Sequence, residues 1–321
     1  MSDDIADHPE VGLQEFEASR KCVELLRSKG FEVEYPFSGF DTALKDLQDE
    51  LDADIHIVGT PAEESEGAKC KMSNDGIFKV YDMAIMVHLY DQNLTYCRLN
   101  GLATIMYNFH GVPSHAGAMP WGGQNALNAA QLMLHGIDCI RGCSEPSTRL
   151  NSIIVQGGFA GGSIPEEAKV ETWIRHPEYP YLEKLMERVD KCAEGGALMA
   201  ECTWDKYYTA EVYKSMKRNY EGEAAIAEAF EELGLELNGD HDKLFGSSDI
   251  GNVSWECPSL HPTLQLAPRG ATIHTREFLE CVKGEKAHQC LDDGAKLIAY
   301  TVVKIFTDES RIQMMKEDFS K

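Results

Sequence analysis

The sequence predicts a two-domain α/β protein, and three features of the chain point to that class. Its 321 residues suffice for two domains, since one domain typically takes about 100–200 residues. The apolar run Asp54 to Val58 stops at Gly59-Thr60-Pro61, as a strand of an open α/β sheet does. The middle of the chain alternates strand and helix patterns in the order β-α-β-β-α-β, which is the ferredoxin-like unit of four strands and two helices.

The first part of the chain begins with a helical pattern. Apolar residues within 9–29 recur at helical spacing, and Gly30 follows at a natural C-cap position. Strands are expected at Phe31 to Tyr35, at 54–58 and at Met83 to Tyr90, because these short runs are rich in apolar and β-branched residues. This part therefore supplies helices and strands of one α/β domain.

The middle part forms a second, inserted domain by the same reasoning. Its expected elements are a strand at 102–109, a helix at 123–141, strands at 150–156 and 168–175, a helix at 179–200 and a strand at 201–208. We place this domain at 100–208. Residues 1–99 and 209–321, with helices expected at 220–233 and 285–306, then form one discontinuous domain.

Composition excludes several classes of partner. The formal net charge is −23, and such a surface repels the phosphates of nucleic acid and the head groups of anionic membranes. No apolar run reaches the roughly 18 residues of a membrane helix, and the first ten residues lack the pattern of a secretion signal. The ten cysteines contain no Cys-x-x-Cys pair and indicate reduced thiols. We therefore expect a cytoplasmic protein.

Three segments place carboxylate or imidazole groups at expected strand ends or loops. They are Gly59 to Glu64, Met86-Val87-His88 and Ile273-His274-Thr275. Such side chains suit zinc or manganese, and one acid of an adjacent pair can serve as a general base. Each segment also has a purely structural interpretation. In that interpretation the acids are solvated at a helix start, one histidine lies in a core, and His274 precedes an N-cap at Thr275.

Read in order, the motifs of the chain resemble one enzyme family. The motifs are His8-Pro9-Glu10-x-Gly12, Gly59 to Glu64, Met86-x-His88, Ser114-His115-Ala116, Asn125-Ala126-Leu127, Ile164-Pro165, Arg175, Ser248-Asp249-x-Gly251-Asn252-Val253-Ser254, His261-Pro262 and His274-Thr275. This order resembles peptidase family M-20, and in particular its amidohydrolase branch, which includes aminobenzoyl-glutamate hydrolase and aminoacylase-like dipeptidases. The resemblance runs from about Asp7 to Phe306.

The resemblance implies a fold and a chemistry. The fold is a zinc-exopeptidase-like catalytic domain, here 1–99 and 209–321, with the inserted ferredoxin-like domain mediating a homodimer. The reaction is hydrolysis of an amide bond in an N-acyl amino acid or small dipeptide, with two zinc or manganese ions as cofactors. The implied site residues are the general base Glu63, the metal ligands Glu64, His88 and His274, the carbonyl-binding His115 and the carboxylate-binding Arg175.

One departure from the family limits this expectation. The Gly-His-x-Cys-Gly-His string that supplies further metal ligands in the family is absent, and the join points to a missing segment between Thr42 and Leu44. The sequence therefore predicts an incomplete sheet and too few ligands for two ions, unless His56 or Cys70 substitutes. A non-catalytic relative that binds or dimerises, or a deletion product, stays an alternative to the hydrolase.

Overall fold

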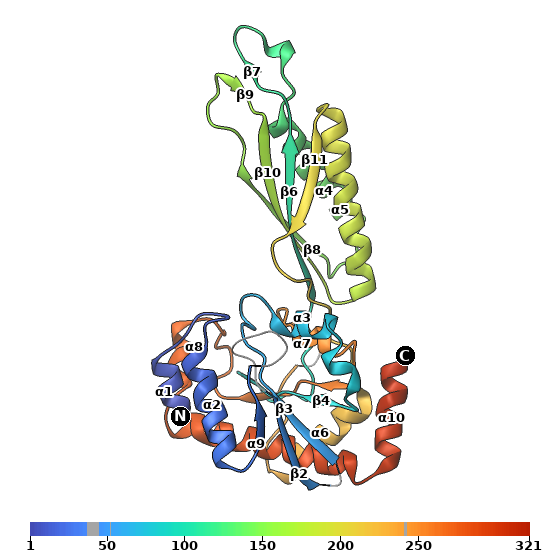
Figure 1. Cartoon of the computed structure of the whole chain (residues 1–321). Coiled ribbons are helices and arrows are strands. Elements are labelled where there is room, and N and C mark those ends of the chain that lie inside the picture. Colours follow the sequence, from blue (N-terminus) through green and yellow to red (C-terminus); the bar gives the residue numbers. More distant parts are fainter. Residues whose placement is uncertain (37–44, 52, 241–242) are drawn as a thin grey trace. The chain divides into compact units, whose positions relative to one another are not determined.

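The computed structural model describes residues 1–36, 45–51, 53–240 and 243–321. These residues divide into two compact units (Figure 1). Unit 1 comprises Met1–Arg98 and Met216–Lys321, and unit 2 comprises Leu99–Ser215. The predicted deletion point between Thr42 and Leu44 lies outside the described residues.

Unit 2 has the β-α-β-β-α-β order that its sequence predicts. The elements are β6 (Gly101–His110), α4 (Ala126–Arg141), β8 (Arg149–Gln156), β10 (Glu167–His176), α5 (Tyr179–Met199) and β11 (Thr203–Tyr208). The four strands form one antiparallel sheet in the order β11-β6-β10-β8, and α4 and α5 cover one of its faces (Figure 1). The alternate residues of β6 and β10 that face these helices are buried, which is why both strands show a period of two.

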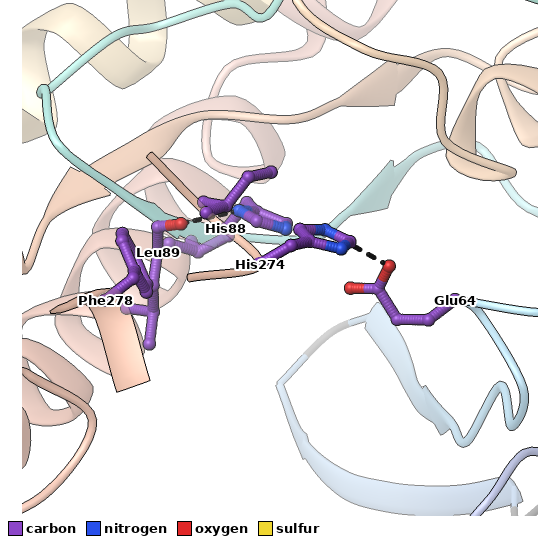
Figure 2. A pocket seen from close by; sticks show the side chains of 7 residues that line it. Glu64, His88, Leu89, His274 and Phe278 are labelled. Carbon is purple, nitrogen blue, oxygen red and sulfur yellow. Dashed lines mark hydrogen bonds and ion pairs between the residues drawn. The ribbon is translucent and has the colours of Figure 1, made fainter. Parts of the chain in front are cut away.

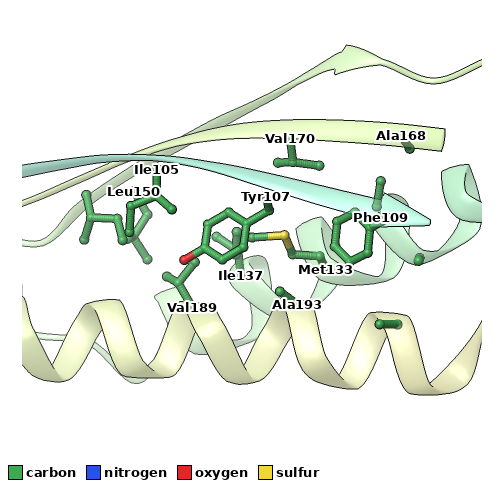
Figure 3. Close-up of a cluster of buried hydrophobic side chains, with 14 of the residues drawn as sticks. Ile105, Tyr107, Phe109, Met133, Ile137, Leu150, Ala168, Val170, Val189 and Ala193 are labelled. Atoms are coloured by element: carbon green, nitrogen blue, oxygen red, sulfur yellow. The ribbon is translucent and has the colours of Figure 1, made fainter. Parts of the chain in front are cut away.

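The core of unit 2 lies between this sheet and its two helices. Tyr107 from β6, Met133 and Ile137 from α4 and Val189 from α5 meet there and are almost fully buried (Figure 3). The Tyr107 hydroxyl donates a hydrogen bond to Asp190 at 2.8 Å, so its one polar group is satisfied. This unit therefore has a complete core of its own.

A small ribbon extends from unit 2. It pairs β7 (Ser114–His115) with β9 (Ser163–Ile164), and the short 3₁₀ helix η2 (Pro120–Gly122) follows β7. The ribbon places His115 in a two-residue strand at the start of a turn.

The first segment of unit 1 forms two helices and a three-stranded sheet. The elements are α1 (Ser2–Asp7), α2 (Phe16–Ser28), β1 (Glu32–Glu34), β2 (Lys45–Leu51) and β3 (Ala53–Val58), and the strands pair antiparallel in the order β1-β2-β3. The helix expected over 9–29 begins only at Phe16. The carboxylate of Glu10 accepts hydrogen bonds from the backbone N–H groups of Glu17 and Ala18 in its first turn, so it caps the helix from outside.

The rest of unit 1 consists of short strands and longer helices. The single strand expected over Met83 to Tyr90 is two strands, and each pairs in parallel with a late strand of the chain. The remaining elements are α3 (Ala68–Asn74), η1 (Ile77–Val80), β4 (Ala84–Ile85), β5 (His88–Tyr90), α6 (Tyr220–Glu232), α7 (Ile250–Val253), β12 (Ser259–Leu260), β13 (Thr263–Gln265), α8 (Arg276–Cys281), α9 (Glu285–Phe306) and α10 (Glu309–Ser320).

Helices α6, α9 and α10 pack around the apolar core of unit 1. This core includes Phe230, Leu264, Leu297 and Ile305, all nearly inaccessible to solvent. The sheets of unit 1 are small and open, and the predicted mixed α/β fold is confirmed. Within the described residues, no helix is both long and apolar enough to cross a membrane.

Candidate functional site

A strained turn carries the two adjacent glutamates. After β3 ends, Ala62 adopts a left-handed conformation with φ of +54°, which costs a non-glycine residue about 1–2 kcal/mol. Its backbone N–H donates a hydrogen bond to Glu15 Oε1 at 2.7 Å, which helps to hold this conformation. Glu63 and Glu64 follow in the turn before α3 begins, so they do not lie in the helix that the solvated-acid interpretation requires.

Glu63 has a polar partner from the end of the chain. The Ser248 hydroxyl donates a hydrogen bond to Glu63 Oε1 at 2.6 Å. Next to Ser248, the buried Asp249 accepts hydrogen bonds from both the Lys69 ammonium group, at 2.8 Å, and the Lys69 backbone N–H, at 3.0 Å. Burial raises the pKa of Asp249, and the positive charge of Lys69 opposes that rise. The dipeptide at 248–249 thus joins the glutamate turn to α3.

Glu64 faces a different environment, a pocket in unit 1. The pocket has a volume of about 570 Å³ and is lined by Glu64, Val87, His88, Leu89, Ile273, His274 and Phe278 (Figure 2). The carboxylate of Glu64 and Nε2 of His274 are 3.4 Å apart. Both side chains are mostly exposed, so this contact adds little to stability. The structure therefore brings three of the predicted ligand residues to one pocket.

His88 has a defined orientation in this pocket. Its Nδ1 donates a hydrogen bond to the carbonyl oxygen of Leu89 at 2.7 Å, which leaves the Nε2 lone pair as the acceptor of the neutral ring. The ring of His261 lies edge-on to it, with centroids 5.7 Å apart. His261 is buried and donates from Nδ1 to the Met86 carbonyl oxygen at 3.0 Å, and burial lowers its pKa to about 3. His261 is therefore neutral, and its ring packs against that of His88.

His274 occupies the second strained position of the site. Its φ is +64°, and it directly precedes the N-cap of α8. The Thr275 hydroxyl accepts a hydrogen bond from the Phe278 N–H at 3.3 Å, as the sequence predicts. Strained backbone clusters at functional sites. One of the two strained residues, His274, makes the contact with Glu64, and the other, Ala62, lies two residues before Glu64.

The described residues do not fit a two-ion cluster. They contain no group of three or more histidine, cysteine, aspartate or glutamate side chains that could hold a metal ion. The two substitutes considered from the sequence have other environments. Nδ1 of His56 lies 2.9 Å from the Tyr81 hydroxyl, and Cys70 is fully buried in α3. We therefore derive no chemical step through a metal ion.

The other two predicted site residues belong to unit 2. His115 is exposed, and its Nδ1 accepts hydrogen bonds from the backbone N–H groups of Gly117 and Ala118, each at 3.1 Å. The proton of the neutral ring is then on Nε2. Arg175 lies on β10, with its guanidinium carbon 5.0 Å from the centre of the Trp173 ring, and partial burial lowers its pKa.

Sequence reasoning gave no role to Lys69, Ser248, Asp249 or His261. Three of them lie within motifs that carry the resemblance, but a motif does not show which neighbour a side chain contacts. The sequence offers little signal for Lys69, which stands between Ala68 and Cys70 with a second lysine at 71. A buried lysine requires a carboxylate partner, but no pattern in the sequence identifies Asp249 as that partner.

Comparisons with known proteins show what this chain is similar to. Residues 98–198 match the peptidase dimerisation domain of the M20 family. Over 284 residues the chain is 28% identical to the Xaa-Arg dipeptidase of Mus musculus, covering 88% of this chain and 66% of the relative. Over 322 residues it is 25% identical to one of the p-aminobenzoyl-glutamate hydrolase polypeptides of Escherichia coli strain K12, covering 82% of this chain and 66% of the relative. The chain thus spans less than two-thirds of the length of either.

Solved structures share the fold. The Bacillus subtilis YXEP protein, described as a dinuclear metal binding peptidase from the M20 family, aligns with a TM-score of 0.66 and 14% identity, over 98% of this chain and 97% of that one. A mixed α/β unit and a segment that matches a peptidase dimerisation domain together resemble the M20 class of peptidases. More narrowly, the chain is similar to M20 peptidases and to members of their amidohydrolase branch, and the resemblance read from its motifs is confirmed.

Proposed function

We propose that this chain is an amide hydrolase whose substrates are dipeptides or N-acyl amino acids. One observation carries the proposal. Adjacent carboxylates have separate partners, since Glu63 accepts a hydrogen bond from Ser248 while Glu64 lines a pocket with His88 and His274. The names of the relatives, a dipeptidase and an aminobenzoyl-glutamate hydrolase, support the substrate class. We further propose that the protein is cytoplasmic.

In this proposal Glu63 accepts the proton of the attacking water and passes it to the leaving amine. The hydrogen bond from Ser248 holds one of its carboxylate oxygens in place. Such general acid–base help contributes about 10²–10⁴-fold, whereas enzymes typically accelerate reactions about 10⁶-fold or more. Because the described residues form no metal-holding group, we expect turnover by this chain to be slow.

Two residues of unit 2 have proposed roles in substrate binding. The tautomer of His115 presents Nε2–H as a donor, which suits the oxygen of the scissile carbonyl. The guanidinium of Arg175 suits the carboxylate of the substrate, because its planar fork can bind two oxygens. Dipeptides and N-acyl amino acids carry both groups.

The test is an assay with an Xaa-Arg dipeptide and with p-aminobenzoyl-glutamate. The unsubstituted chain should hydrolyse at least one of them slowly, and Glu63→Gln should remove the residual rate because an amide cannot accept the proton. Glu66→Gln is a matched control, since Glu66 lies in the same turn but accepts its hydrogen bond from Ser65 and not from Ser248. A rate that is equal in the chain and in Glu63→Gln would contradict the proposal.

The described residues contain no metal-holding group, which favours two alternatives. One is a non-catalytic relative that binds a peptide or dimerises, and the other is a deletion product without a function of its own. Calorimetric titration with the same compounds separates these possibilities from the hydrolase. Binding without any turnover would identify the binding relative. Neither binding nor turnover would identify the deletion product.

A further inference from the structure

Helices α4 and α5 of unit 2 pack against each other unusually closely. A Cβ atom added at Gly196 would lie 2.6 Å from the carbonyl oxygen of Ala129. One added at Gly136 would lie 3.0 Å from Cβ of Cys192 and 3.5 Å from its Cα. Gly196, late in α5, meets Ala129, early in α4, whereas the earlier Cys192 meets the later Gly136. The two helices are therefore antiparallel. Glycine is needed at both contacts because the backbones nearly touch.

Two cysteines lie near this contact on opposite helices, Cys139 on α4 and Cys192 on α5. The Arg188 side chain, one turn before Cys192, donates hydrogen bonds to the carbonyl oxygens of Ile140 at 3.2 Å and Cys143 at 3.3 Å. Cys192 therefore lies level with the α4 turn between Gly136 and Ile140, which is the turn that carries Cys139. Cys139 is exposed and Cys192 is partly buried.

The Cys192 sulfur lies 3.1 Å from the position of a Cβ atom added at Gly136, at the start of the α4 turn that carries Cys139. The pKa of Cys192 is raised chiefly by burial, and the charge of Cys139 raises it further while Arg188 opposes the rise. The two Cα atoms of a disulfide usually lie about 4.4–6.8 Å apart, a separation that requires helices packed as closely as α4 and α5 are at Gly136 and Cys192. Both cysteines are free thiols.

We propose that Cys139 and Cys192 are an oxidation site that forms a reversible disulfide with a small-molecule disulfide such as oxidised glutathione. The exposed Cys139 thiolate attacks the oxidant, forms a mixed disulfide and releases one glutathione thiolate. The Cys192 thiolate then attacks the Cys139 sulfur and releases the second. Two protein thiols lose two electrons and two protons, and one oxidised glutathione becomes two reduced ones.

The bond would join the two helices that cover the sheet of unit 2. The loop it closes, 139–192, contains β8, β10 and most of α5, and closing a long loop restricts the unfolded chain. The disulfide would therefore stabilise the fold of unit 2 under oxidising conditions, and its reduction would remove that stabilisation. It is independent of the proposed hydrolase activity.

Peptide mapping of the full chain tests this site. The reduced protein is incubated with oxidised glutathione, remaining thiols are alkylated, and the protein is digested with trypsin and a glutamate-specific protease without reduction. Arg141 separates Cys139 from Cys143, and Glu194 separates Cys192 from Cys202, so each thiol falls on its own peptide. We expect a linked pair containing Cys139 and Cys192, which dithiothreitol removes.

Serine variants give the controls. Cys143→Ser should keep the link, because Cys143 lies past the end of α4. Cys139→Ser and Cys192→Ser should each lose it and leave the other thiol glutathionylated or alkylated, with circular dichroism unchanged. Oxidation that yields only single glutathione adducts, or a link from Cys192 to Cys143, would overturn the proposal.

Discussion

At the residue scale, the two adjacent acids of one turn contact different partners. The left-handed Ala62 precedes them, Glu63 accepts a hydrogen bond from Ser248, and Glu64 contacts His274. The two adjacent carboxylates therefore contact different chemical groups, a hydroxyl at Glu63 and an imidazole at Glu64.

The buried pair Lys69–Asp249 supports this arrangement, and removing one partner should be costly. Lys69→Met leaves Asp249 buried without its cation, and such a loss typically costs about 3–5 kcal/mol. The double variant Lys69→Met/Asp249→Leu should be clearly more stable than Lys69→Met, since no buried charge is left. Urea unfolding of the three proteins measures the difference. Equal stability of the single and double variants would show that the pair is not buried as described.

The sequence could predict these site residues only in part. The motif order led to Glu63, Glu64, His88 and His274, and the structure brings the last three to one pocket. It could not predict the link between Lys69 and Asp249, because 180 residues separate them and no local pattern relates them. Contacts of that kind depend on tertiary packing rather than on periodicity.

At the element scale, unit 2 was predictable and much of unit 1 was not. Outside its small ribbon, the strands and helices of unit 2 are six to 21 residues long, so their periods are visible in the sequence. Strands such as β4 and β12 have two residues each, too few to show a period of two. The strand β2 has the sequence Lys-Asp-Leu-Gln-Asp-Glu-Leu, and its charged residues have low strand propensity.

The close contact of α4 and α5 gives a matched pair of glycine variants. Gly196→Ala should destabilise the protein by about 1–3 kcal/mol, because the new Cβ would lie 2.6 Å from the Ala129 carbonyl oxygen. Gly195→Ala should be neutral or stabilising, since nothing lies within 4 Å of its Cβ position and alanine favours a helix by about 1 kcal/mol over glycine. Thermal unfolding of both variants measures this contrast. A Gly196→Ala protein as stable as Gly195→Ala would contradict the close packing.

At the scale of the whole molecule, metal content follows from the ligand set. The described residues hold no group of three possible ligands, and each missing ligand removes a large share of the roughly 10 kcal/mol that a complete zinc site contributes. We therefore expect less than one tightly bound ion per chain. Elemental analysis after loading with zinc or manganese and dialysis measures it. Two ions per chain that survive dialysis would show that further residues complete a cluster.

The two units also differ in how far each depends on the rest of the chain. Unit 2 is one continuous segment, Leu99–Ser215, with its own core between sheet and helices, and 98–198 match a dimerisation domain. Unit 1 is assembled from both ends of the chain and has only small sheets. A fragment of unit 2 buries the same core as the full chain, so its folding free energy should be largely retained.

The segment 99–215, expressed alone, should therefore fold and form a homodimer. We expect a cooperative thermal transition, because the four-stranded sheet and both helices are complete within it. We also expect light scattering to give a molar mass twice that of one fragment. Phe109→Asp is the matched control for folding, since it places a charge in the core of this unit and should abolish the transition. A folded fragment that is monomeric at high concentration would separate the two expectations. It would leave the core intact as a folding unit and refute the homodimer proposed through this domain.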